Sequence, residues 1–146
     1  MKFTADRLPY RQTAAFNRIV LDYIDQAEAI RPFSQHAPTL QGLQKAMAER
    51  QLFPTNREVL VAELTRQYET VTTTDLVKQN IRSLLSEQTF TITTAHQNNL
   101  FTGPLYFVYK IFSTINLAEK LKEQFPSYDF VPVYWMGSED HDFEEI

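Results

Sequence analysis

The stretch that decides the fold runs from Thr89 to Ile146 and reads TFTITTAHQNNLFTGPLYFVYKIFSTINLAEKLKEQFPSYDFVPVYWMGSEDHDFEEI. Residues 89–95 are short, rich in β-branched side chains and bounded by polar residues, which predicts a strand. Pro104 then begins a long apolar helix, because proline is favoured in the first helical turn. The nearly continuous apolar run 130–136 predicts a second strand, buried on both faces, with Trp135 in the core.

A strand, a helix and a second strand in this order predict a right-handed βαβ crossover with parallel strands. The polar loops 96–99 and 137–142 then leave the sheet at the same edge, where ligands of open α/β sheets bind. The candidate catalytic residues are His96, Glu139, Asp140 and His141. The candidate substrate- or nucleotide-binding residues are Gln97, Asn98, Gly103, Lys110, Ser138 and Asp142.

These residue types support several kinds of chemistry. Backbone amides at the start of the helix after Gly103 can bind a phosphate or a carboxylate. His96 and Gln97 can hydrogen-bond a phosphate or stabilise charge on a leaving group, and residues 139–142 can bind a metal, transfer a proton or hold an amine. The phosphate-binding patterns GxGxxG and GxxxxGK[ST] are absent.

Each candidate also has an ordinary structural interpretation. His96 can cap the end of its strand or the following helix, and Lys110 can extend along the surface. The acidic run at residues 140–145 can be the acidic first turn of a further helix. That run lacks a known metal-ligand spacing, so we predict no metal site.

The residues before Thr89 form helical patterns with apolar stripes. One helix is predicted from Thr13 to Ile30 and a second after Pro38, in which Gly42 is a weak point. Thr55 and Glu58 form a capping box for a third helix, and Thr74 or Asp75 caps a fourth. We therefore predict a helical segment over residues 1–87 and the start of an α/β core over residues 88–146.

The composition narrows the function classes. The net charge of −4 gives no basic surface for nucleic acid or anionic lipid. The chain contains no cysteine and no apolar run long enough to span a bilayer, and it begins without the apolar core of a signal peptide. We expect a cytoplasmic protein. Two parallel strands do not make a stable sheet, so we also expect the chain to be the amino-terminal part of a larger α/β protein, inactive alone.

Three runs of the sequence resemble one known family, the cysteine ligases of bacillithiol biosynthesis (BshC family). They are FNRIVLDYIDQAEAIRPF (16–33), TTAHQNNLFTGPLYFVYKIFSTINLAEKL (93–121) and FVPVYWMGSEDHDFEEI (130–146). The match covers nearly the whole chain but only the amino-terminal region of a family member. Ala95 stands where the family commonly has glycine. The loop from His96 to Gly103 departs from the HIGH-type motif of synthetases, because it has one histidine.

The resemblance implies a Rossmann-like α/β fold and an enzyme that joins cysteine to glucosaminyl malate by an amide bond. We expect no nucleic-acid or membrane partner from the charge, and the resemblance implies a homodimer formed through a downstream coiled coil. The cofactor stays open, with a nucleotide such as ATP or ADP as the candidate. The resemblance also places Glu139, Asp140 and His141 in the active crevice, on the amino sugar or the cysteine ammonium group or in proton transfer.

Two other functions are compatible with the residues. One is a metal-dependent hydrolase that uses the carboxylates of residues 139–142. The other is a non-catalytic Rossmann-like module that binds a nucleotide or a partner.

Overall fold

The computed structural model of the chain describes residues 4–101 and 103–139. Two compact units are present, Met1–Phe53 and Pro54–Ile146. The helices between residues 54 and 87 therefore belong to the same unit as the strands. The predicted division of domains at residue 87 stays a prediction.

The first unit contains four short elements: α1 (Tyr10–Thr13), α2 (Arg18–Ile24), the 3₁₀ helix η1 (Glu28–Ile30) and α3 (Leu40–Arg50). The prediction of one helix from Thr13 to Ile30 is wrong. Ala14 and Gln26 have φ angles of 53° and 54°, and this left-handed backbone interrupts a helix. The side chain of Asn17 accepts a hydrogen bond from the Val20 amide and begins a new helix at Arg18.

The predicted helix after Pro38 is confirmed as α3, with Thr39 as its N-cap. The Thr39 hydroxyl accepts a hydrogen bond from the Gly42 amide at 3.1 Å. Gly42 is a requirement of the packing here, because a Cβ atom at this position would lie 1.9 Å from the Ala37 carbonyl oxygen.

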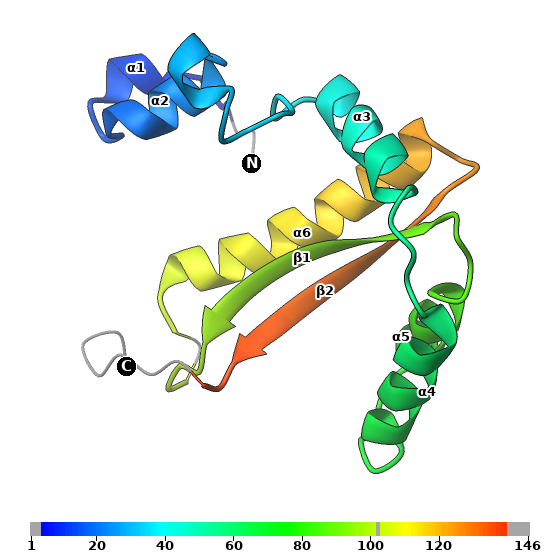
Figure 1. Cartoon of the computed structure of the whole chain (residues 1–146). Helices are drawn as coiled ribbons and strands as arrows, with labels where there is room; N and C mark the ends of the chain where they lie inside the picture. The colour runs from blue at the N-terminus through cyan, green and yellow to red at the C-terminus, as the bar shows by residue number, and fades with distance from the viewer. Residues whose placement is uncertain (1–3, 102, 140–146) are drawn as a thin grey trace. The chain divides into compact units, whose positions relative to one another are not determined.

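The second unit contains α4 (Arg57–Tyr68), α5 (Asp75–Ser83), β1 (Thr89–Gln97), α6 (Leu105–Gln124) and β2 (Asp129–Gly137). The two strands are parallel, and α6 runs along one face of them (Figure 1). The predicted order of strand, helix and parallel strand is confirmed, and with it the α/β fold class.

The core of this unit joins the α4–α5 pair to the sheet. Val61 of α4, Leu84 after α5 and Val131 of β2 are buried together. On the α6 side, Thr114, Ala118 and Leu121 are buried. Burial of these side chains holds α6 and the α4–α5 pair against the strands and stabilises the unit by the hydrophobic effect.

Helix caps and one arginine fix the entry into β1. The N-cap of α4 is Asn56 rather than the predicted Thr55, because its side-chain oxygen accepts from the Val59 amide. Thr74 caps α5 as predicted. The Arg57 guanidinium donates to the carbonyl oxygens of Leu84 at 2.8 Å and Thr89 at 3.2 Å, so α4 is tied to the residues that precede and begin β1.

The predicted burial of the second strand on both faces is wrong for the described residues. Trp135 is 60% exposed, and Tyr134 and Met136 are exposed too. The reason is that the cluster with α4 and Leu84 covers Val131 and Val133, and residues 134–136 lie beyond it. Among residues 4–101 and 103–139, no helix has the length and apolar character needed to cross a membrane.

Candidate functional site

The two strands end side by side. In the parallel register His96 lies opposite Met136, and Gln97 lies opposite Gly137. A Cβ atom on Gly137 would lie 3.5 Å from the His96 carbonyl oxygen, so the backbones approach closely at this edge. The predicted convergence of the two strand ends is confirmed. The chain segments that follow both strands start from this edge.

His96 and Gln97 are the last residues of β1, and their predicted place in a loop is wrong. Pairing with Met136 and Gly137 extends the strand by two residues beyond Ala95. Both side chains are buried, with 9% of His96 exposed. Because both side chains are buried, a ligand at this edge would contact His96 only through the residues around it.

The His96 ring is held by hydrogen bonds at both nitrogens. Nε2 lies 2.7 Å from the Tyr106 hydroxyl oxygen on α6. Nδ1 lies 2.9 Å from the Asn99 side-chain nitrogen and 3.0 Å from the Gln97 carbonyl oxygen. The Phe107 ring packs edge-on against the imidazole, at 5.7 Å between centroids. From β2, the Tyr134 hydroxyl donates to the His96 carbonyl oxygen at 3.1 Å. The histidine is therefore a fixed centre on which the loop, the helix and both strands converge.

The loop between β1 and α6 is folded around Asn99. The Asn99 amide nitrogen donates to the Gln97 carbonyl oxygen at 3.0 Å. Gly103 has a φ angle of 64°, and a Cβ atom on it would lie 2.8 Å from Asn99 Cγ. Only glycine fits this position without strain. Asn98 is exposed beside this folded turn.

Lys110 lies one helical turn beyond Tyr106 on α6. Its Nζ donates to the Ala95 carbonyl oxygen at 2.5 Å and lies 5.9 Å from the centroid of the Tyr106 ring. The ammonium group binds the backbone of β1 at an exposed position, which is compatible with a lysine that extends along the surface. It brings a positive charge to the carboxyl-terminal part of that strand.

The segment after β2 begins with a turn. The Ser138 amide donates to the Met136 carbonyl oxygen at 2.9 Å, and the side chains of Ser138 and Glu139 are exposed. Asp140, His141 and Asp142 lie outside the described residues. The part of the chain that the structure describes has no group of three His, Asp or Glu side chains placed to hold a metal ion.

The structure adds three residues to the site that the sequence did not single out. Tyr106, Asn99 and Tyr134 contact His96 from the helix, the loop and the neighbouring strand. The spacing of three residues between His96 and Asn99 is typical of a local turn. No local sequence pattern marks the two tyrosines, because their contacts with His96 depend on the packing of α6 and on the register of the strands.

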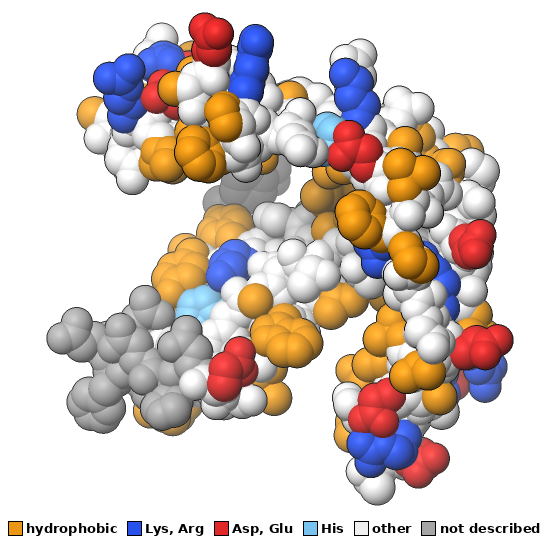
Figure 2. All heavy atoms as spheres, in the orientation of Figure 1, with side chains coloured by type: hydrophobic (Ala, Val, Ile, Leu, Met, Phe, Trp, Pro, Cys, Tyr) orange, Lys and Arg blue, Asp and Glu red, His pale blue; other side chains and the backbone are white. Residues whose placement is uncertain are grey.

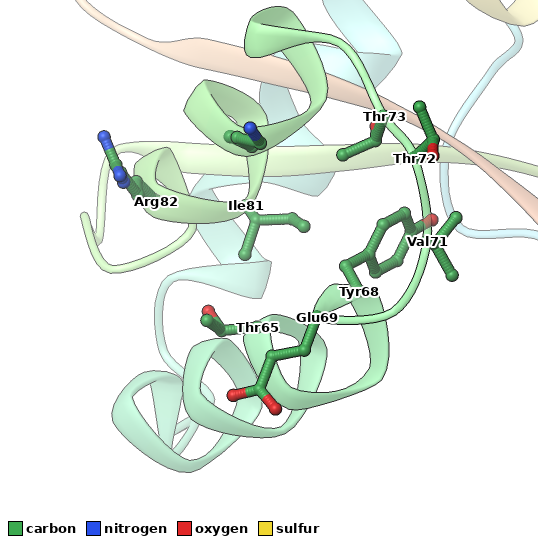
Figure 3. A pocket seen from close by; sticks show the side chains of 9 residues that line it. Thr65, Tyr68, Glu69, Val71, Thr72, Thr73, Ile81 and Arg82 are labelled. Atoms are coloured by element: carbon green, nitrogen blue, oxygen red, sulfur yellow. The ribbon is translucent and has the colours of Figure 1, made fainter.

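The described part of the second unit also has cavities away from this edge. One, of about 390 Å³, lies between α4 and α5 and is lined by Tyr68, Thr73 and Lys78 among others (Figure 3). Another, of about 420 Å³, is lined by residues of α5, α6 and β2, including Lys122. Neither cavity includes the strand ends. We place the candidate site at the strand ends because a buried histidine and its hydrogen-bond network lie there.

Comparison with known proteins shows the family of the chain. Residues 3–146 match the family model described as "Bacillithiol biosynthesis BshC, N-terminal Rossmann-like domain". A "Putative cysteine ligase BshC" of Flavobacterium johnsoniae is 50% identical over 143 residues, which are 97% of this chain and 27% of that protein. A protein of the same name from Salinibacter ruber is 35% identical over 97% of this chain and 26% of its own length. The chain thus spans about a quarter of the length of these curated relatives.

Proposed function

This chain belongs to the BshC family of bacillithiol biosynthesis and matches its N-terminal Rossmann-like domain, and we therefore propose that the full-length protein is a cysteine ligase. The substrates in this proposal are cysteine and glucosaminyl malate. The amino group of the sugar attacks the cysteine carboxyl carbon, a C–N bond forms, and one carboxyl oxygen leaves. The same proposal places the protein in the cytoplasm, as a homodimer that forms through a coiled coil downstream of this chain.

The observation that carries the proposal is the family match over residues 3–146. The parallel ends of β1 and β2 support the position of the site, because ligands of open α/β sheets bind beyond the carboxyl ends of the strands. His96 and Gln97 lie at the end of β1, and Ser138 and Glu139 follow β2.

A nucleotide such as ATP, when bound, supplies the activation that a free carboxyl group needs before an amine can displace its oxygen. The first turn of α6 fits a phosphate or a carboxylate, because no side chain caps it and the positive end of the helix dipole lies there. The residues proposed to bind the nucleotide or substrate at this end are Gln97, Asn98, Gly103 and Lys110. Those proposed after β2 are Ser138 and Asp142.

The proposed roles on the β2 side belong to Glu139, Asp140 and His141. Carboxylates attract the ammonium group of cysteine or of the amino sugar, and a carboxylate or a histidine can take the proton that the attacking amine must lose. Glu139 is exposed beside the strand ends, which is compatible with contact to a substrate.

The direct test is to incubate the full-length protein with cysteine, glucosaminyl malate and ATP and to follow the products by mass spectrometry. The expected product has the mass of the two substrates less one water. His141→Ala should abolish it, whereas His36→Ala should not, because His36 lies in the first unit and pairs with Glu49. Absence of product from the wild type, or stoichiometric zinc or manganese with hydrolytic activity, would refute the proposal. Full activity of the His141 variant would refute that residue's role.

A further inference from the structure

We infer that the outward face of the first turns of α6 is a docking surface for a later segment of the same polypeptide, the part of the full-length protein that follows residue 146. The inference rests on the surface of the second unit and on the length of the relatives. It does not depend on the proposed reaction.

The outward face of α6 lies opposite the face that packs on the strands. Three buried residues mark the inner face: Thr114, Ala118 and Leu121. Three residues at the same spacing mark the outward face of the first turns: Leu105, Tyr109 and Phe112. These outward residues are 71%, 65% and 58% exposed, respectively. The first turns of α6 therefore have large apolar side chains on the side that the second unit does not cover.

Such an outward face is unusual for this architecture. A helix that connects two parallel strands packs its apolar side on the sheet and turns a polar side to water. Leu100 and Phe101, in the loop that leads to α6, are exposed as well. Figure 2 shows hydrophobic side chains, coloured orange, gathered at the surface over this end of α6. Large apolar groups exposed together mark a surface that another segment covers.

The apolar part of the outward face is short. Beyond Phe112 the same face continues with exposed polar residues, which are Asn116, Lys120 and Glu123. Residues 105–112 rise by about 12 Å along the helix axis. The docking surface therefore covers only the part of α6 that lies nearest the strand ends.

This size decides between two occupants. Separate proteins that form a stable interface bury about 800 Å² on each partner, which is more than one face of two helical turns offers. A segment of the same polypeptide needs a smaller contact, because its covalent link to the surface raises its effective concentration. The surface therefore fits a tethered segment better than a second copy of the protein.

The course of the chain brings a later segment within reach. Met136 pairs with His96 near the end of the sheet, and His96 Nε2 lies 2.7 Å from the Tyr106 hydroxyl oxygen in the first turn of α6. The chain thus leaves β2 beside the amino-terminal end of α6 (Figure 1). Its relatives are about four times as long, and the match is to their N-terminal domain, so most of a full-length protein can supply the segment.

The docked segment closes the α6 side of the candidate site. Its contact with residues 105–112 removes water from the surroundings of Tyr106, which is 48% exposed in this chain. Exclusion of water strengthens electrostatic interactions with a ligand at the strand ends. The segment is therefore a wall of the site as well as a packing partner of α6.

Photochemical crosslinking in the full-length protein tests the occupant. Tyr109→p-benzoylphenylalanine places a reactive ketone on the docking surface, and Lys120→p-benzoylphenylalanine places the same group on the polar part of the same face. Irradiation of the first variant should join residue 109 to a peptide from beyond residue 146 of the same chain, whereas the control should give no such product.

Mass spectrometry identifies the joined peptides, and a denaturing gel separates links within one chain from links between two chains. A product of double mass would mean that a second copy covers the surface, which would overturn the inference. A link only to residues within this chain would overturn it too. So would equal yields from the two variants, including no product from either.

A charge substitution tests burial of the same surface independently. Phe112→Glu should lower the thermal unfolding midpoint of the full-length protein by about 5 °C or more, because it places a carboxylate in an apolar contact. Asn116→Glu, one turn further along the same face, should change the midpoint by less than about 1 °C. If Phe112→Glu does not fold, Phe112→Ala replaces it and should lower the midpoint in the same direction. Equal shifts at the two positions would overturn the inference.

These results are separable from the test of the proposed function. A crosslink to a later segment without any ligase product would refute the proposed function and leave this inference standing. Ligase product from a protein that gives no such crosslink would overturn this inference alone.

Discussion

Arg57 offers the sharpest test of how the second unit is assembled. Its guanidinium bonds the carbonyl oxygens of Leu84 and Thr89 at 2.8 and 3.2 Å. Both carbonyls lie where α5 ends and β1 begins, and Leu84 and Thr89 are buried. Arg57→Met keeps the aliphatic stem of the side chain and removes both donors.

The magnitude follows from the two bonds. A hydrogen bond from a charged donor contributes about 1.5–3 kcal/mol, and the longer second bond and the partial exposure of Arg57 argue for the lower end. We expect Arg57→Met to cost roughly 2–3 kcal/mol of local stability. That cost corresponds to about 30- to 150-fold faster amide exchange where exchange occurs by local opening.

Hydrogen–deuterium exchange with mass spectrometry on the full-length protein measures this change. Peptides that cover residues 84–92 should exchange faster in the Arg57→Met variant. Arg82→Met is the matched control, because the Arg82 side chain is exposed on α5 and makes no hydrogen bond or ion pair with the described residues. Equal exchange of these peptides in both variants and the wild type would refute the tie between α4 and the start of β1.

Three further changes test other parts of the structure. Gly103→Ala forces a Cβ atom to within 2.8 Å of Asn99 Cγ at a φ angle of 64°. The substitution should therefore lower the local stability by about 1–2 kcal/mol and weaken anion binding. Wild-type amide exchange and wild-type affinity in calorimetry would contradict this. Lys122→Met removes an ammonium group that donates to three acceptors between residues 126 and 129, all 2.8–3.0 Å away. Amide exchange at the start of β2 should therefore become faster by about 5- to 30-fold. Unchanged exchange there would be evidence that Lys122 does not stabilise the start of β2. The hydrogen bond from Arg66 lowers the pKa of Glu63 from its ordinary 4.5 to about 2, with a second contribution from Gln67. Because its pKa is lowered in the folded protein, ionised Glu63 stabilises the fold above pH 4.5, and this stabilisation is lost as the pH falls toward 2. The urea midpoint of Glu63→Gln should therefore differ from that of the wild type more at pH 6 than at pH 3. A larger difference at pH 3 would contradict the lowered pKa.

Local signals in the sequence were sufficient to predict the strand, helix and strand of the second unit. Pro104, the β-branched run before it and the apolar run after the helix predict the strand, helix and strand that the structure contains. The N-cap at Thr74 is equally local, since one hydroxyl bonds an amide three residues on. Such features depend on a few neighbouring residues, and the sequence carries them directly.

Features that depend on distant packing were not predictable. Ala14 and Gln26 have left-handed backbone without being glycine, so no residue type marked the breaks in the first predicted helix. The extension of β1 to Gln97 depends on pairing with Gly137, which is forty residues away. The bonds of Tyr106 and Tyr134 to His96 depend on how α6 and β2 pack beside β1.

The central claim is that the ligand site lies at the shared carboxyl ends of β1 and β2. A crystal structure of the full-length protein with bound glucosaminyl malate tests it most directly. We expect an anionic oxygen of the ligand beside the uncapped first turn of α6, and the rest of the ligand beside the segment that follows Gly137. A ligand bound in the cavity between α4 and α5, against Tyr68 and away from both strand ends, would contradict the claim.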